Sequence, residues 1–410
     1  MALNIIWVAF FVIAFVIALF KLVFLGDTAI FKLLADGIFD SAKVSVMDVA
    51  LPLAGTMVFF LGLMNIAEKA GAIQKLAKWM NPFLSRLFPE VPANHPAMGQ
   101  MVMNFSANML GLDNAATPFG LKAMESLQSL NPEKEKATNA QIMFLVLHTS
   151  GLTIIPLTII SYRLAAGSTD AASIFIPCVL ATIGTTLASI LMVGFYQKLK
   201  WDKVLISWLL GLIGLMTGVL FLVNGLSPEN KEVVSKVVGN GLLIFIIVMI
   251  ILGGVYKKVS VFDAFIEGAK NGFDVVLKII PYLVAMLVAI RVFRDSGAMT
   301  YILNGLTYLI QLTSVNTDFI PALPVAIMKP LSGSGARGMM LDIFQTSGPD
   351  SFVGKLASIF QGSADTTFYI IALYFGSVGI KKVRYAIWAG IYADLIGVVI
   401  AIIIGYTFFR

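Results

Sequence analysis

Polar side chains interrupt this apolar chain at two short segments that could hold a solute. Asn104, Ser106 and Asn108 alternate in MNFSANM, and Ser332 and Ser334 alternate with glycines in KPLSGSGARG. Alternate residues face different sides of a regular helix, so they would converge only in unwound backbone, where glycine also permits a positive φ and a close approach to a ligand. The pattern predicts hydrogen bonds to a polar solute. The alternative is that Asn and Ser bond between helices and only hold a bundle together.

A second pair of polar segments could bind an ion. HTSGLT begins at His148 and QGSADTT begins at Gln361. An ionisable carboxylate in a membrane segment costs at least about 3 kcal/mol and is by default functional, so Asp365 could bind a coupling cation or pair with Arg337 as a structural lock. His148 titrates near neutral pH and could carry a proton, with a neutral structural histidine as an equal alternative. The predicted ion-coupling residues are Asp365, Thr366, His148, Ser150 and Thr153.

Basic residues flank the Ser-Gly segment at Lys329 and Arg337. If they point into a cavity, the solute is anionic or rich in acceptors, because guanidinium suits carboxylate and phosphate. If they extend to the membrane surface, they carry no information about the solute. Asp394 has no evident partner in the sequence and is a weaker coupling candidate. The predicted solute-binding residues are Asn104, Ser106, Asn108, Asn114, Thr117, Lys329, Ser332, Ser334, Arg337, Gln361 and Ser363.

The elements that position these residues must be membrane helices. Of the 410 residues, 58% are hydrophobic and 13% are charged, whereas a soluble domain carries about 25% charged residues. Continuous apolar runs, without the alternation of a barrel, predict an all-α polytopic membrane protein. The first run lacks a preceding basic residue and a clear cleavage site, so we expect a retained helix rather than a signal peptide. The predicted spans are residues 5–25, 49–66, 174–196, 204–223, 241–255, 275–292 and 385–408.

Two further stretches, residues 94–130 and 141–162, are apolar in part but contain Asn, Gly and Pro at several positions. Each unpaired backbone group in hydrocarbon costs several kcal/mol unless protein or a water-filled cavity satisfies it. Broken helices at these two places therefore predict a cavity.

The two ends of the chain repeat one plan. ADGIFDSAK precedes a helix with Pro52 and the turn EKAGAI, while IEGAKNGF precedes a helix with Pro281 and the turn RDSGAM. The two polar segments then follow in the same order in each half. Basic loops at 198–203 and 381–384 predict a cytoplasmic side, and the link at 166–172 lacks Lys and Arg, so the repeats are expected to be inverted. The predicted organisation is an N-terminal helix (1–26), a first repeat (27–197), two linking helices (198–258) and a second repeat (259–410).

Enzymatic motifs are missing from the sequence. It has no Walker loop, no dinucleotide glycine pattern and no zinc spacing, and Ser334 lacks the Gly-x-Ser-x-Gly pattern of a nucleophile elbow. An intramembrane hydrolase using His148 is the remaining enzymatic alternative. The formal charge of +6 is not concentrated in a basic block, so we expect no nucleic-acid partner, and we expect no cofactor.

Long polar motifs identify a family resemblance. They are FPEVPANHPAMG (88–99) and MNFSANMLGLDNAATPFGLKAM (103–124) in the first half, and KPLSGSGARG (329–338), GPDSFVGKLAS (348–358) and QGSADTTFYIIALYFGSVGIKKVRYA (361–386) in the second. The chain resembles a fusion of the bacterial spore maturation proteins A and B, in the group named for the nucleoside-recognition or Gate domain. The resemblance implies a multi-pass protein of the bacterial inner membrane. It also implies kinship with concentrative nucleoside transporters and with the membrane part of ferrous iron transporter B.

The sequence thus predicts a secondary transporter of a small polar solute, anionic or nucleoside-like, coupled to protons or sodium. Its expected partners are the solute, the coupling cation and membrane lipid, and a homo-oligomer is left open. The alternative is a non-transporting membrane component that supports envelope or peptidoglycan maturation of the spore type.

Overall fold

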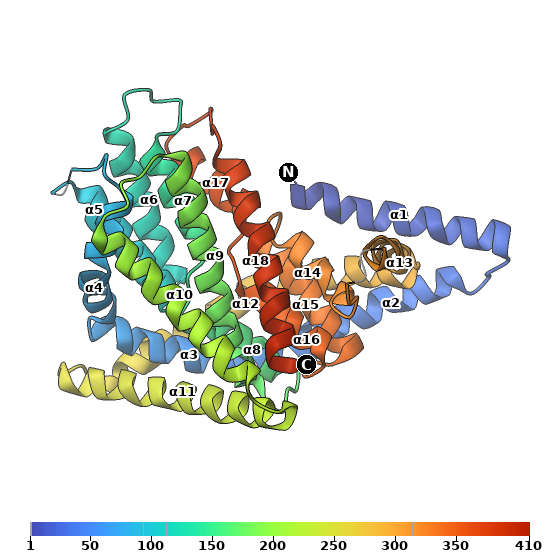
Figure 1. Ribbon diagram of the computed structural model, residues 1–410. Coiled ribbons are helices and arrows are strands. Elements are labelled where there is room, and N and C mark those ends of the chain that lie inside the picture. The colour runs from blue at the N-terminus through green and yellow to red at the C-terminus, as the bar shows by residue number, and fades with distance from the viewer. Residues whose placement is uncertain (1, 93, 112, 313–314) are drawn as a thin grey trace.

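The regular structure of the protein is helical. The computed structural model describes residues 2–92, 94–111, 113–312 and 315–410. Over those residues it contains helices and one isolated β-bridge, between Lys136 and Lys382 (Figure 1). The helices of the N-terminal half are α1 (Ala2–Leu25), α2 (Ile30–Val44), the π-helical turn η1 (Ser45–Ala50), α3 (Leu51–Lys69), α4 (Ala72–Leu87), α5 (Pro96–Met109), α6 (Asp113–Ser129), α7 (Asn139–Thr149), α8 (Leu157–Ala165), η2 (Ala171–Ile174) and α9 (Phe175–Tyr196).

Two long helices and a second set of broken helices complete the chain. The long helices are α10 (Lys203–Asn224) and α11 (Pro228–Tyr256). The C-terminal half contains α12 (Val261–Asp295), α13 (Ala298–Gln311), η3 (Ile320–Ala322), α14 (Leu323–Met328), α15 (Gly333–Ser347), α16 (Phe352–Gly362), α17 (Thr367–Ser377) and α18 (Ala386–Phe409).

The predicted all-α membrane fold is confirmed. Within the described part of the chain, six helical stretches are long and apolar enough to cross a membrane, and the bent pair Val261–Asp274 and Ile279–Asp295 could form a seventh. Each predicted span falls on one of these stretches. The pair meets at 41°, close to Pro281, whose ring displaces the carbonyl one turn earlier and removes a helical hydrogen bond.

The predicted span at 49–66 is only the end of a 40-residue helical stretch, Ile30–Lys69. The π-helical turn η1 interrupts this stretch immediately before Pro52. Proline has no N–H to donate, so a regular helix loses one backbone hydrogen bond at Pro52. The wider π-helical turn before it accommodates this loss. Hydropathy had marked only the more apolar part of the stretch.

Two pairs of helices, α3 with α12 and α9 with α18, pack antiparallel. Along α3 and α12, Gly62 lies against Phe265 and Gly272 lies against Val58, and along α9 and α18, Gly397 lies against Thr185. At the helical glycines a Cβ atom would come within 3 Å of the neighbouring helix, so glycine permits these close backbone approaches. This packing arranges the broken helices of the two halves around a common centre.

Other helices present apolar side chains outward. Figure 1 shows α1 and α2 extending as an arm from the body and α11 lying along one side of it. On α10 and α11, Phe221 and Tyr256 are each 80% exposed. Further exposed apolar side chains, Leu210 and Leu215 on α10 and Phe245 and Leu252 on α11, are what lipid-facing helices require.

The structure confirms the two predicted breaks in the first half. The chain leaves helical geometry between α5 and α6, where Gly111 has φ of 72°, and between α7 and α8, where Gly151 has φ of 59°. The expectation of unwound backbone around Asn104–Asn108 is wrong, because these residues lie within the regular helix α5. The glycines of the Ser-Gly segment also differ from expectation, since neither Gly333 nor Gly335 has a positive φ.

Candidate functional site

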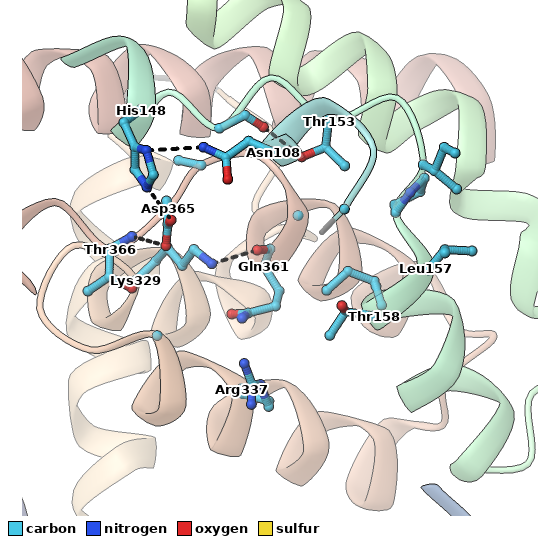
Figure 2. Close-up of a pocket in the computed structure, with 18 residues that line it drawn as sticks. Asn108, His148, Thr153, Leu157, Thr158, Lys329, Arg337, Gln361, Asp365 and Thr366 are labelled. Atoms are coloured by element: carbon cyan, nitrogen blue, oxygen red, sulfur yellow. Dashed lines mark hydrogen bonds and ion pairs between the residues drawn. The ribbon is translucent and has the colours of Figure 1, made fainter. Parts of the chain in front are cut away.

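A pocket lies where the broken helices of the two halves meet (Figure 2). Its cavity volume is about 160 Å³, and a cavity of roughly 150 Å³ can hold a molecule the size of benzene. Both halves of the chain contribute polar groups to it. Its polar and glycine lining consists of Asn108, Gly111, His148, Gly151, Thr153, Thr158, Lys329, Gly333, Arg337, Gln361, Gly362, Asp365 and Thr366.

The α7–α8 and α16–α17 breaks join through their backbones. The N–H of Asp365 donates to the carbonyl of Thr149 over 2.7 Å. A Cβ atom on Gly151 would lie 3.2 Å from Asp365 N, so this position needs glycine both for its φ and for the close approach. Each break therefore satisfies polar backbone groups that the other leaves without helical partners.

The α14–α15 turn joins the same centre. The N–H of Phe368 donates to the carbonyl of Pro330 over 3.0 Å, and a Cβ atom on Gly333 would lie 2.6 Å from Thr366 Oγ1. The glycine at 333 thus serves close packing rather than an unusual φ. As a result, Lys329 and Arg337 flank the pocket from either side of this turn.

His148 is the most enclosed polar residue of the pocket. It belongs to α7 and is 3% exposed. Its Nδ1 lies 3.0 Å from Asn104 Oδ1 and 3.1 Å from Asn108 Nδ2. Its Nε2 lies 3.7 Å from Asp365 Oδ2. Tyr374 of α17 packs edge-on against the ring, with centroids 5.0 Å apart.

Asp365 faces His148 rather than Arg337, so the structure does not form the lock that was one alternative for these residues. Its other carboxylate oxygen accepts the backbone N–H of Thr366 over 2.7 Å. The side chain is 46% exposed toward the pocket. A carboxylate held in this way can exchange a proton or a cation with the pocket while contacting a buried ring.

The two basic residues both line the pocket but differ in their contacts. Lys329 Nζ donates to the carbonyl of Gln361 over 2.8 Å, at the C-terminal end of α16, where a cation is favoured. The Arg337 guanidinium lies over the Tyr162 ring, 5.2 Å from its centroid, and its Nε has no acceptor among the described residues. Gln361 Oε1 is likewise buried without a donor in the described part of the chain. Figure 2 shows Arg337 beyond Gln361, on the far side of the pocket from His148 and Asp365.

Eight predicted site residues line the pocket: Asn108, His148, Thr153, Lys329, Arg337, Gln361, Asp365 and Thr366. Seven others that the structure describes do not: Asn104, Ser106, Thr117, Ser150, Ser332, Ser334 and Ser363. The side chain of Asn114 lies outside the described residues.

Several of these seven have structural contacts instead. The hydroxyls of Ser106, Ser150 and Ser363 donate to backbone carbonyls within their own helices or helix ends. Ser332 caps α15 by accepting the N–H of Gly335 over 3.0 Å, and its hydroxyl lies 3.2 Å from that of Ser334. Asn104 stands behind His148 and orients it.

Sequence reasoning did not identify Tyr374, Thr158 or the contact between Thr367 and Asp394. Tyr374 contacts His148, Thr158 lines the pocket, and Thr367 Oγ1 donates to Asp394 Oδ2 over 2.8 Å. Asp394 is 8% exposed. Its partner, Thr367, lies 27 positions earlier in the chain, which is why the sequence showed no partner. Thr367 and Tyr374 both belong to α17, but nothing local indicates which helix they face.

Both halves of the chain match known proteins. The family described as nucleoside recognition, or Gate, matches residues 50–167 and 276–381, and these two segments contain all of the pocket lining. Spore maturation protein B of Bacillus subtilis (strain 168) is 48% identical over 159 residues, which cover 39% of this chain and 88% of that protein. Spore maturation protein A of the same organism is 37% identical over 200 residues, covering 49% of this chain and 98% of that protein.

No solved structure matches the chain. The family match extends over more than half of the sequence, and the two relatives are covered almost completely. The chain therefore belongs to the Gate nucleoside-recognition family of membrane proteins, and its matches are consistent with a fused relative of spore maturation proteins A and B.

Proposed function

We propose that this protein is a secondary transporter of a small anionic solute in the bacterial inner membrane. The observation that carries the proposal is the pocket shared by the broken helices of both halves, in which Arg337 Nε and Gln361 Oε1 lack partners among the described residues. A buried donor and a buried acceptor without partners cost about 1–3 kcal/mol each. A solute that supplies both partners would recover that free energy on binding.

The charge of the pocket favours an anion. Arg337 and Lys329 both line it, and the N-terminus of α15 begins there at Gly333, whereas Asp365 is the one carboxylate in its described lining. Guanidinium binds carboxylate or phosphate through paired donors, and a helix N-terminus attracts negative charge. Gln361 Oε1 would accept a hydrogen bond from a hydroxyl or amino group of the same solute. The expected class is a carboxylate or phosphate that also carries a donor.

The architecture supports transport. Discontinuous helices around a central site are typical of secondary transporters, in which one repeat moves against the other. The antiparallel packing of α3 with α12 and of α9 with α18 supports inverted repeats at 27–197 and 259–410, with 1–26 and 198–258 outside them. We propose no enzymatic step for this chain. The rival function is a non-transporting component of envelope or spore maturation.

Uptake by the purified protein in proteoliposomes tests the proposal. The probes are two matched pairs, uridine with uridine monophosphate and succinate with succinamide, each with and without an imposed proton or sodium gradient. At least one anion should accumulate while its neutral counterpart does not. Arg337→Gln should lower that uptake by about 10- to 100-fold, because a hydrogen bond between charged groups contributes about 1.5–3 kcal/mol.

The matched control is Arg410→Gln, since Arg410 pairs with Asp318 at the surface and does not line the pocket. It should transport like the wild type. Uptake of the neutral probes alone would refute the anionic class. If no probe moves under either gradient, and Asp365→Asn leaves the phenotype of the producing cell intact, the protein is not a transporter of this kind.

A further inference from the structure

The contacts of His148 point to the coupling ion. We propose that this ion is a proton held jointly by His148 and Asp365, and that it moves in the same direction as the anion. The inference rests on the proposed transport function and adds to it the identity of the ion, the two residues that bind it and the reason why ion and solute bind together.

The first step concerns Nδ1 of His148, which meets both an acceptor and a donor. Asn104 Nδ2 donates to the carbonyl of Ala116 over 2.7 Å, which fixes that amide so that its Oδ1 faces the ring. Nδ1 carrying a proton can donate to this oxygen over 3.0 Å. Nδ1 without a proton can accept from Asn108 Nδ2 over 3.1 Å. Both tautomers of the neutral ring are therefore provided with a partner.

The second step concerns the other ring nitrogen. When Nδ1 carries the proton of a neutral ring, Nε2 presents a lone pair to Asp365 Oδ2, 3.7 Å away. An ionised carboxylate there would face that lone pair with no hydrogen between them. In this tautomer the contact becomes favourable when one further proton is present, on the ring or on the carboxyl group. In the other tautomer Nε2–H already points to the carboxylate, and a further proton on Nδ1 can be donated to Asn104 Oδ1. The pair is thus a site for one exchangeable proton, open to the pocket through the partly exposed carboxylate.

Other ionisable groups near the pair come from three elements. Lys329, which follows α14, lines the same pocket, and Asp394 of α18 lies within electrostatic range of both Lys329 and Asp365. Tyr374 of α17 lies with its hydroxyl 3.4 Å from His148 Nδ1. Arg337 lies toward the opposite end of the pocket (Figure 2). Because Lys329 and Arg337 line the same pocket, one further proton on the pair makes its lining more positive.

The third step links the proton to the solute. Uptake of one proton removes a negative charge from the pocket that the anion must enter. The proton therefore raises the affinity for the anion, and by reciprocity the anion raises the affinity for the proton. Neither ligand has to touch the other for the two to be bound together. Symport of proton and anion follows from this arrangement.

The ring can be observed directly because the chain has two histidines, His95 and His148. Nitrogen-15 NMR of histidine-labelled protein should show a signal from His148 that changes on addition of the transported anion, while the signal of His95 serves as the reference. In Asp365→Asn the change should vanish. A His148 signal that changes neither with the anion nor with the Asp365 substitution would overturn the inference. This measurement needs no substitution at His148.

Flux and binding provide the second arm. For the anion that the proteoliposomes accumulate, an inward proton gradient should drive uptake and an entrapped pH dye should report proton entry. Its apparent Kd should weaken by about tenfold per pH unit above the titration of the pair, as one linked proton requires. Asp365→Asn should remove the pH dependence of binding and the proton flux, while Asp318→Asn, away from the pocket, should keep both.

The outcomes separate the two proposals. Uptake driven by sodium and indifferent to the proton gradient would overturn the proton inference and leave transport standing. Proton flux that survives in Asp365→Asn would do the same. Absence of uptake under either gradient would remove the transport function itself, and with it the coupling.

Discussion

Two loop contacts join the halves of the chain, at opposite ends of α9, and they use different chemistry. At one end Arg163 binds the loop at Asp350, and at the other Lys381 binds the loop at Glu135. Arg163 is fully buried, whereas the side chains of Lys381 and Glu135 are 73% and 61% exposed. In each contact, a segment near the end of one half meets a loop in the other half.

The buried contact depends on side chains. The Arg163 guanidinium donates to Asp350, to the carbonyls of Pro349, Ala171 and Asp170, and to the hydroxyls of Ser168 and Ser358. Ser168 and Thr169 donate to the same carboxylate. A buried cation is tolerated when its donors are satisfied to this degree.

The exposed contact depends mainly on the backbone. The N–H groups of Lys381 and Lys382 both donate to the carbonyl of Glu135, and the N–H of Ala137 donates to the carbonyl of Lys382. The ion pair between Lys381 and Glu135 adds to these bonds in water, where it contributes little. Side-chain substitutions should therefore lower the stability strongly at the buried end and hardly at all at the exposed end.

The largest effect is expected for Arg163→Ala. It removes a buried cation, takes one donor from Asp350 and leaves the Pro349 and Ala171 carbonyls without the guanidinium, so it should cost about 3–5 kcal/mol of stability. Arg163→Lys should recover only part of this loss, because one ammonium cannot reach the acceptors that the planar guanidinium connects. Thermal unfolding in detergent measures both variants. A melting temperature of Arg163→Ala equal to that of the wild type would refute the role of burial.

Asp350→Asn should have an intermediate effect. Although burial opposes ionisation, hydrogen bonds from Ser168 and Thr169 and the charge of Arg163 hold the pKa of Asp350 below its usual value. A depressed folded-state pKa stabilises the protein above the unfolded pKa, about 3.9, and this stabilisation is lost as the pH falls through the folded pKa. The variant should be less stable by about 1–2 kcal/mol at neutral pH, because the charge is lost but an acceptor oxygen remains.

The pH dependence provides the control for this substitution. Melting temperatures of Asp350→Asn and the wild type should begin to converge as the pH falls below ~4 and should meet only below the depressed folded-state pKa, where the carboxylate is protonated in both the folded and unfolded chains. A difference that stays constant across this range would show that the loss comes from the shape of the side chain and not from its charge.

The difference between the two contacts also shows which features a sequence can reveal. Hydropathy located the spans, and Gly111, Gly151 and the prolines located the breaks, because these signals are local. Pairs such as Arg163 with Asp350 are 187 residues apart and leave no local pattern.

The error at α5 had a different cause. Asn104 and Asn108 are four residues apart and share a helical face, so a regular helix already directs both toward His148 and turns Ser106 away. The expectation of unwound backbone therefore overlooked the four-residue spacing of Asn104 and Asn108, which already indicated their shared direction. The segments of His148 and Asp365 were expected to face each other from their equivalent places in the two halves, but which of their atoms meet required the three-dimensional arrangement of the helices.

The smallest effect is expected at the exposed contact. Lys381 lowers the pKa of Glu135 through a hydrogen bond and its charge, yet both side chains remain in water. Lys381→Ala, Glu135→Ala and the double variant should unfold within measurement error of the wild type, and the double-mutant cycle should give no coupling at physiological salt. The backbone bonds persist in all three variants. A clear coupling in the cycle would mean that the ion pair, and not the main chain, holds this end together, and the two ends of α9 would then be closed by the same chemistry.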